Sequence, residues 1–239
     1  MGFGFLALLF SYLPALNQSF ARREANILLL DARAGSPPCA AEMLRRHSNE
    51  HGREALQRLL EEWEHWTAEF LEGHLSYPVL AYFRSQHDNV SWLSSLTAVL
   101  DTCALIIAGV ECSCERQARL TFAVARHAVV DLCLVFQIAP QEPSYDRLPD
   151  ETRTKLRAIL AEAGLKVQTE GGADVKLTEL RNMYEPYVHA LAAFFYINLP
   201  PWVHESEKLD NWQTSAWEPR VKASLRRWRK ISAPKRDHW

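Results

Sequence analysis

An amphipathic stripe in residues 49–73 constrains the fold more than any other feature of this sequence. Large apolar side chains recur there at spacings of three and four, and five glutamates, at positions 61, 62, 64, 69 and 72, occupy the other faces. The apolar residues are Leu56, Leu59, Leu60, Trp63, Trp66 and Phe70. This is the period of an α-helix with one buried face. Because one helix cannot bury such a face alone, we expect other helices to pack against it.

The rest of the chain also favours helix. It has no convincing alternating strand pattern and only nine glycines, and its prolines gather at 37–38, 140–149 and 200–201, where they punctuate helical segments. We predict an all-α chain in which a long N-terminal, partly membrane-type helix leads into a cytoplasmic multi-helix bundle. The expected helices cover residues 4–34 with a bend or break at Pro14, a short segment near 37–47, 49–73, 90–110 capped by Asp88 or Asn89, 115–138, 150–163, and 175–198 with a bend at Pro186.

Two of these segments, 90–110 and 115–138, are apolar nearly all round. A helix without a polar face is either central in a bundle or faces lipid. Charged residues in the second segment favour the bundle, because a charge in hydrocarbon costs roughly 2.5 kcal/mol or more. Buried charges must be paired, so we predict a buried polar network with Tyr184 or Glu185 as further partners. Its members are Asp101, Arg126, His127 and Asp131.

Composition excludes several function classes. The net charge of −2 does not favour a nucleic-acid partner, and no phosphate-binding, dinucleotide-binding or hydrolase motif occurs. Five cysteines in apolar segments suit a reducing compartment. Cys112 and Cys114 lack a second ligand pair at zinc spacing, so we interpret them as thiols at a helix end. We therefore predict no enzyme activity, no cofactor and no metal. The alternative is a soluble metal-dependent helical-bundle hydrolase that uses His87, Asp101, His127 and Asp131.

The C-terminal segment carries a run of basic residues with no acid among them. Read as a helix, it would be basic and amphipathic, which suits an anionic membrane surface; read as a tail, it would be solvated and disordered. The sequence leaves both possibilities open, and a membrane-surface scaffold is a further alternative function. The residues concerned are Arg226, Arg227, Trp228, Arg229 and Lys230.

The first sixteen residues are almost wholly apolar and are followed by Arg22 and Arg23. They lack the charged start and cleavage site of a signal peptide, and they are shorter than the roughly 20 residues that span a bilayer. We interpret them as the inner half of a spanning helix. Arg22 and Arg23 then mark its cytoplasmic boundary, and Gly4 and Pro14 loosen or bend it.

Several longer stretches carry a resemblance to a known family. They include "GFGFLALLFSYLPALNQSFARREANILLLDARAGSPPCAAEMLRRH", "YPVLAYFRSQHDNVSWLSSLTAVLDTCALIIAGV", "ARLTFAVARHAVVDL" and "LRNMYEPYVHALAAFFYINLPPW". Residues 2–202 resemble the part that follows the pore in bacterial two-transmembrane, pore-loop potassium-channel-like proteins. The resemblance implies potassium transport, a homotetramer, contact with membrane lipid, and an inner-membrane location with most of the chain in the cytoplasm.

The chain departs from that family in one important respect. The first membrane helix, the pore helix and a Thr-Val-Gly-Tyr-Gly filter are missing, so we expect that this chain does not conduct alone. Met1 is then a misassigned start inside a longer reading frame that supplies the pore segment, the start of a genuine truncation, or the start of a fragment. We therefore predict three parts of the chain. Residues 1–34 are the end of an inner helix with its connecting helix, and residues 35–203 are a helical bundle that acts in assembly or gating. Residues 204–239 are a basic tail.

Overall fold

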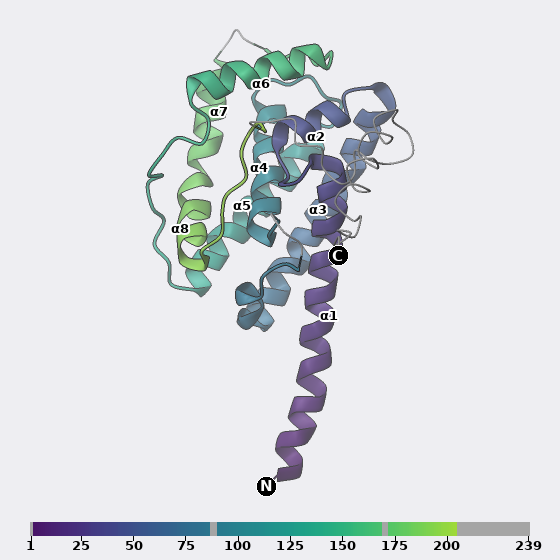
Figure 1. The fold of residues 1–239 in the computed structure, drawn as a ribbon, viewed down its shortest axis with the longest axis vertical. Coiled ribbons are helices and arrows are strands. Elements are labelled where there is room, and N and C mark those ends of the chain that lie inside the picture. Colours follow the sequence, from purple (N-terminus) through teal and green to yellow (C-terminus); the bar gives the residue numbers. More distant parts are fainter. Residues whose placement is uncertain (1, 87–89, 169–171, 205–239) are drawn as a thin grey trace, which may run out of the picture. The chain divides into compact units, whose positions relative to one another are not determined.

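The computed structural model describes residues 2–86, 90–168 and 172–204. Within these ranges the chain forms eight α-helices and one 3-10 helix, with no strand, which confirms the all-α prediction. The helices are α1 (Gly2–Ala34), α2 (Ala40–Arg46), α3 (Glu50–Ser76), η1 (Pro78–Tyr82), α4 (Trp92–Ala108), α5 (Glu115–Val135), α6 (Asp150–Glu162), α7 (Ala173–Asn182) and α8 (Glu185–Phe195). Figure 1 shows their arrangement around α4.

The apolar stripe of α3 faces the core as predicted. All six of its members are buried, with Trp66 and Phe70 the most exposed at 4%, and the helix packs chiefly against α5. The Asn49 side chain caps α3 by accepting a 2.6 Å hydrogen bond from the backbone N–H of Gly52.

The helix α4 is the centre of the bundle, because every one of its 17 residues is buried. Its neighbour α5 is different, since it buries one face and exposes the other, with Leu134 71% exposed. The expectation that both segments are central is therefore correct for α4 and wrong for α5. The apolar residues of α5 that point outward made it look uniformly buried in sequence.

Ser91, and not Asp88 or Asn89, caps α4. Its hydroxyl accepts a 3.0 Å hydrogen bond from the N–H of Ser94, and the Ser94 hydroxyl accepts a 2.8 Å bond from the N–H of Ser91. This reciprocal capping box satisfies two backbone donors at the start of the helix. Asp88 and Asn89 lie outside the described residues.

The predicted helix over 175–198 is two helices. The first, α7, ends at Asn182, and α8 begins at Glu185 with Pro186 in its first turn. Proline has no N–H and its ring clashes with the preceding turn, so it starts a helix more readily than it bends one. The break places Tyr184 and Glu185 at a junction between two helices.

The first helix, α1, is continuous over 33 residues and is not interrupted at Pro14 or at Gly4. Its C-terminal half packs into the bundle, where Ile27, Leu30 and Ala34 are fully buried. Its N-terminal half extends beyond the bundle (Figure 1). Of the described residues, none belongs to a helix that is both long and apolar enough to cross a bilayer.

Candidate functional site

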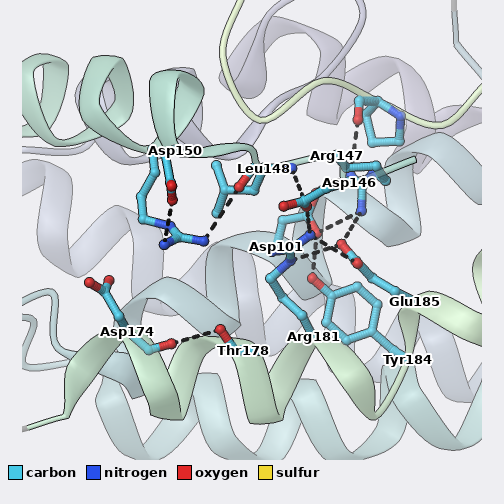
Figure 2. Close-up of polar contacts among 12 residues, drawn as sticks. Asp101, Asp146, Arg147, Leu148, Asp150, Asp174, Thr178, Arg181, Tyr184 and Glu185 are labelled. Carbon is cyan, nitrogen blue, oxygen red and sulfur yellow. Dashed lines mark hydrogen bonds and ion pairs between the residues drawn. The ribbon is translucent and has the colours of Figure 1, made fainter.

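A group of four charged side chains and one tyrosine is buried where α4 meets the junction of α7 and α8 (Figure 2). It comprises Asp101, Arg147, Arg181, Tyr184 and Glu185, which we call the ion cluster. Asp101 comes from the middle of α4 and Arg147 from the loop before α6, whereas the other three belong to the end of α7 and the start of α8. Segments far apart in the sequence therefore supply its members.

Arg147 and Asp101 form the central pair of the ion cluster. The guanidinium contacts the Asp101 carboxylate at 2.5 and 3.2 Å, and it also donates to Glu185 at 3.3 Å and to the carbonyl oxygen of Pro200 at 2.9 Å. The Tyr184 hydroxyl donates to Asp101 at 2.5 Å. The bidentate geometry is the strongest that a guanidinium and a carboxylate adopt.

Arg181 forms the second half of the ion cluster. It donates two 3.0 Å hydrogen bonds to the two oxygens of Glu185, four residues later. It also contacts Asp146 at 2.5 Å, at the half-exposed edge of the cluster. The guanidinium groups of Arg147 and Arg181 lie 5.7 and 5.6 Å from the ring of Trp202, so that indole covers both cations.

Burial sets the electrostatics of the ion cluster. It raises the pKa of Asp101 above its ordinary value, although Arg147 and Tyr184 oppose the rise. Burial disfavours the charged form of Arg147, but the carboxylates of Asp101 and Glu185 outweigh it and raise the pKa of this guanidinium. Burial and the Asp101 carboxylate raise the pKa of Tyr184 well above its usual range. These groups are shielded from solvent, with Asp101 and Tyr184 fully buried, and this favours a structural role in tying four segments together.

The predicted network is only partly present. Asp101 is buried and contacts Tyr184, but Arg126, His127 and Asp131 do not join it. His127 and Asp131 form a 3.2 Å pair on the outer face of α5, with exposed fractions of 67% and 28%. Arg126 donates instead to the carbonyl oxygen of Met183 at 3.2 Å. The prediction that these three residues belong to a buried network is therefore wrong. The reason is that α5 is amphipathic and carries them outside its buried face.

The sequence does not predict Arg147 and Arg181 as members of the ion cluster, nor Asp146 at its half-exposed edge. One signal pointed towards them: Asp101 is the single charged residue in α4, and a lone charge in an otherwise apolar helix requires a buried partner of opposite sign. The partner is in a proline-rich loop, where no periodicity marks a residue as buried. The position of Arg147 therefore had to come from the structure.

The structure also bears on the cysteines and on the metal-dependent alternative. Cys112 and Cys114 are joined by a disulfide just before α5, which corrects the expectation of two thiols and removes this pair from the argument for a reducing compartment. In the part of the chain that the structure describes, no group of three or more histidine, cysteine or carboxylate side chains is placed to hold a metal ion. His87, one residue of the hydrolase hypothesis, lies outside the described residues.

A second site lies where α1 enters the bundle, and we call it the α1 anchor. Arg23 is 3% exposed and donates 2.7 Å hydrogen bonds to the carbonyl oxygens of Leu80 and Phe83. It also donates to Glu24 at 3.0 Å, and Glu24 accepts a 2.5 Å bond from Ser85. The anchor fixes α1 to the turn that connects α3 with α4.

The two arginines predicted at a membrane boundary have different surroundings. Arg22 is exposed, as a boundary residue should be. Arg23 points into the protein, where burial lowers the pKa of its guanidinium although Glu24 opposes this effect, and it lies 4.9 Å from the Phe20 ring. Arg23 is thus committed to the bundle and is not available to lipid headgroups, which corrects its predicted role.

Comparison of this chain with family models, curated proteins and solved structures finds no match. The predicted anionic-surface residues Arg226, Arg227, Trp228, Arg229 and Lys230 lie outside the described residues.

Proposed function

We propose that this chain is the assembly and gating domain of a bacterial potassium-channel-like membrane protein. In this proposal the N-terminal half of α1 is the end of the pore-lining inner helix, and the bundle lies in the cytoplasm. The observation that carries the proposal is the division of α1 into two unlike halves. One half is built into the bundle, and the other has an apolar sequence and extends away from it with Phe10 76% and Leu13 55% exposed.

The α1 anchor gives this proposal a mechanism. We call the N-terminal half of α1, which extends beyond the bundle, its free half. A helix is stiff along its axis, so a movement of the bundle displaces the free half only if the C-terminal half is held firmly. Buried charged hydrogen bonds to Leu80 and Phe83 provide that hold, together with the buried residues Ile27 and Leu30. A rigid-body movement of the bundle then moves the end of the pore-lining helix, and through it the gate.

The ion cluster supports the same proposal in a different way. It ties α4, the loop before α6, the α7–α8 junction and Pro200 together by hydrogen bonds. Such a network makes the bundle move as one body, because breaking a buried pair typically costs about 3–5 kcal/mol. A stiff bundle with one firm connection to α1 suits a domain that transmits movement.

The proposal is tested by potassium flux from vesicles that contain the protein encoded by the full reading frame around this chain. The variants are R23Q, which removes the buried charge of the anchor, and the matched control R22Q, which removes an exposed charge one residue earlier. We expect R22Q to gate like the wild type and R23Q to assemble but to change its open probability. Absence of potassium flux in the wild type, or identical gating in both variants, would overturn the proposal.

A further inference from the structure

Four exposed aromatic side chains gather at the end of the bundle from which α1 emerges. Tyr82 and Phe83 lie at the end of η1, and Phe194 and Tyr196 lie at the end of α8, with exposed fractions of 58%, 42%, 42% and 84%. Figure 1 shows the blue segment around η1 and the C-terminal end of α8 on the side towards which the free half of α1 extends. We call these four residues the aromatic end.

Contacts between rings show that the aromatic end is one continuous surface. Tyr82 lies 6.4 Å from Phe194, and both rest on Phe195, whose ring is 5.3 Å from Tyr82. Arg84 donates to the carbonyl oxygen of Tyr196 at 3.5 Å and so connects η1 with the residues after α8. The two halves of the surface, more than a hundred residues apart in the chain, therefore form a single patch.

The same surface is continuous with α1. The ring of Phe83 lies 5.9 Å from that of Phe20, and the ring of Tyr77, just before η1, lies 5.2 Å from that of Tyr12. Tyr12 is itself 43% exposed. Aromatic side chains thus follow α1 from its free half to the point where it enters the bundle.

The chemistry of this surface matches the boundary between hydrocarbon and water in a bilayer. Tyrosine has an apolar ring and a polar hydroxyl, and it is enriched at the headgroup level of membrane proteins, where arginine side chains also reach the interface. Tyr82, Tyr196 and Arg84 supply these groups around the emerging helix. If the apolar half of α1 lies in a membrane, as proposed, the lipid surface lies next to the end of the bundle from which that half emerges.

We infer that the aromatic end rests on the headgroup layer of the membrane that α1 enters. This inference depends on the proposed function for the membrane itself, but it adds a contact that the proposal does not require. A bundle joined to the membrane through α1 alone could stand away from the lipid. Contact at the aromatic end instead fixes the depth and tilt of the bundle at the bilayer surface.

An environment-sensitive fluorophore tests the inference in the full chain reconstituted into phosphatidylcholine vesicles. Y196C places a nitrobenzoxadiazole label on the aromatic end, and Y145C places it on a tyrosine that is 56% exposed and contacts His189. The native cysteines Cys39, Cys103 and Cys133 are buried, and Cys112 is bonded to Cys114, so the label goes to the introduced thiol. We expect a blue shift and a several-fold gain in emission at position 196 on reconstitution, with little change at 145.

Three other outcomes would overturn the inference. Vesicle association of the chain without a shift at position 196 would leave the proposed function standing and would remove the aromatic contact. Failure of the chain to associate with vesicles would remove both. A shift at 196 in detergent solution that grows with protein concentration would mean that a second copy of the chain covers the surface.

Discussion

The guanidinium of Arg23 donates a 2.7 Å hydrogen bond to the backbone carbonyl oxygen of Leu80, 57 positions later in the chain. Arg22, the preceding residue, is exposed. Two adjacent arginines that look equivalent in sequence thus have different roles, one inside the protein and one at its surface. This difference provides a matched pair of substitutions for the α1 anchor.

We expect R23Q to lower the free energy of unfolding by about 1.5–3 kcal/mol, because it removes buried charged hydrogen bonds to two carbonyl oxygens. R22Q should change that free energy by no more than about 0.5 kcal/mol, as is usual for exposed positions. Urea unfolding of the full chain in detergent micelles measures both values. Equal losses for the two variants would mean that Arg23 does not anchor α1.

We expect R147M to cost about 3–5 kcal/mol of stability, since it leaves the buried carboxylates of Asp101 and Glu185 without this guanidinium. R119M is the control, because Arg119 pairs with Glu115 on the surface at exposed fractions of 53% and 50%. Exposed pairs contribute about 0–1 kcal/mol. The same unfolding experiment compares them, and a small effect of R147M would contradict the structural role of the ion cluster.

Acid should destabilise the bundle partly through His74. Burial lowers the pKa of this imidazole to about 4, whereas an unfolded histidine has a pKa near 6.5. Between these values the unfolded chain binds more protons, so this contribution to stability is complete above about pH 6.5 and is lost as the pH falls towards 4.

The H74Q variant isolates that contribution. Between pH 6.5 and pH 4 this histidine contributes about 3 kcal/mol of pH-dependent stability. From pH 7 to pH 4 the wild type should therefore lose about 3 kcal/mol more unfolding free energy than H74Q. A difference that stays constant with pH would show that His74 is not the group responsible.

Much of the helical framework could be predicted from the sequence, because it depends on local signals. The stripe from Leu56 to Phe70 is read from the spacing of neighbouring residues, and all six of its members are buried as expected. Pro186 predicts a disruption of the helix over 175–198, but whether the helix bends or breaks there depends on how α7 and α8 pack. The sequence does not single out Ser91 as the cap of α4, because Asp88 and Asn89 are equally good capping residues by type.

The candidate sites were harder to predict because they depend on contacts between distant segments. The apolar segment around Asp101 predicts that this residue is buried, but its partner Arg147 lies in a loop 46 positions away. The sequence places Arg23 at a membrane boundary, because a pair of arginines after an apolar stretch is typical of one. Only the packing of η1 against α1 reveals that one of the pair is buried.

The most direct test of the central claim compares two pairs of exposed apolar residues. F10E/L13E changes residues of the free half of α1 that are 76% and 55% exposed, and the control L29E/L120E changes residues of the bundle that are 52% and 46% exposed. A carboxylate in hydrocarbon costs of the order of 2.5–3.5 kcal/mol. Both pairs are already solvent-accessible in the structure, so neither should disturb the core.

The measurement is extraction of cell membranes with alkaline carbonate after expression of the full chain. If the free half of α1 lies in the bilayer, the wild type and L29E/L120E stay in the membrane pellet and F10E/L13E moves to the supernatant. Release of the wild type, or equal retention of the two double variants, would contradict the account.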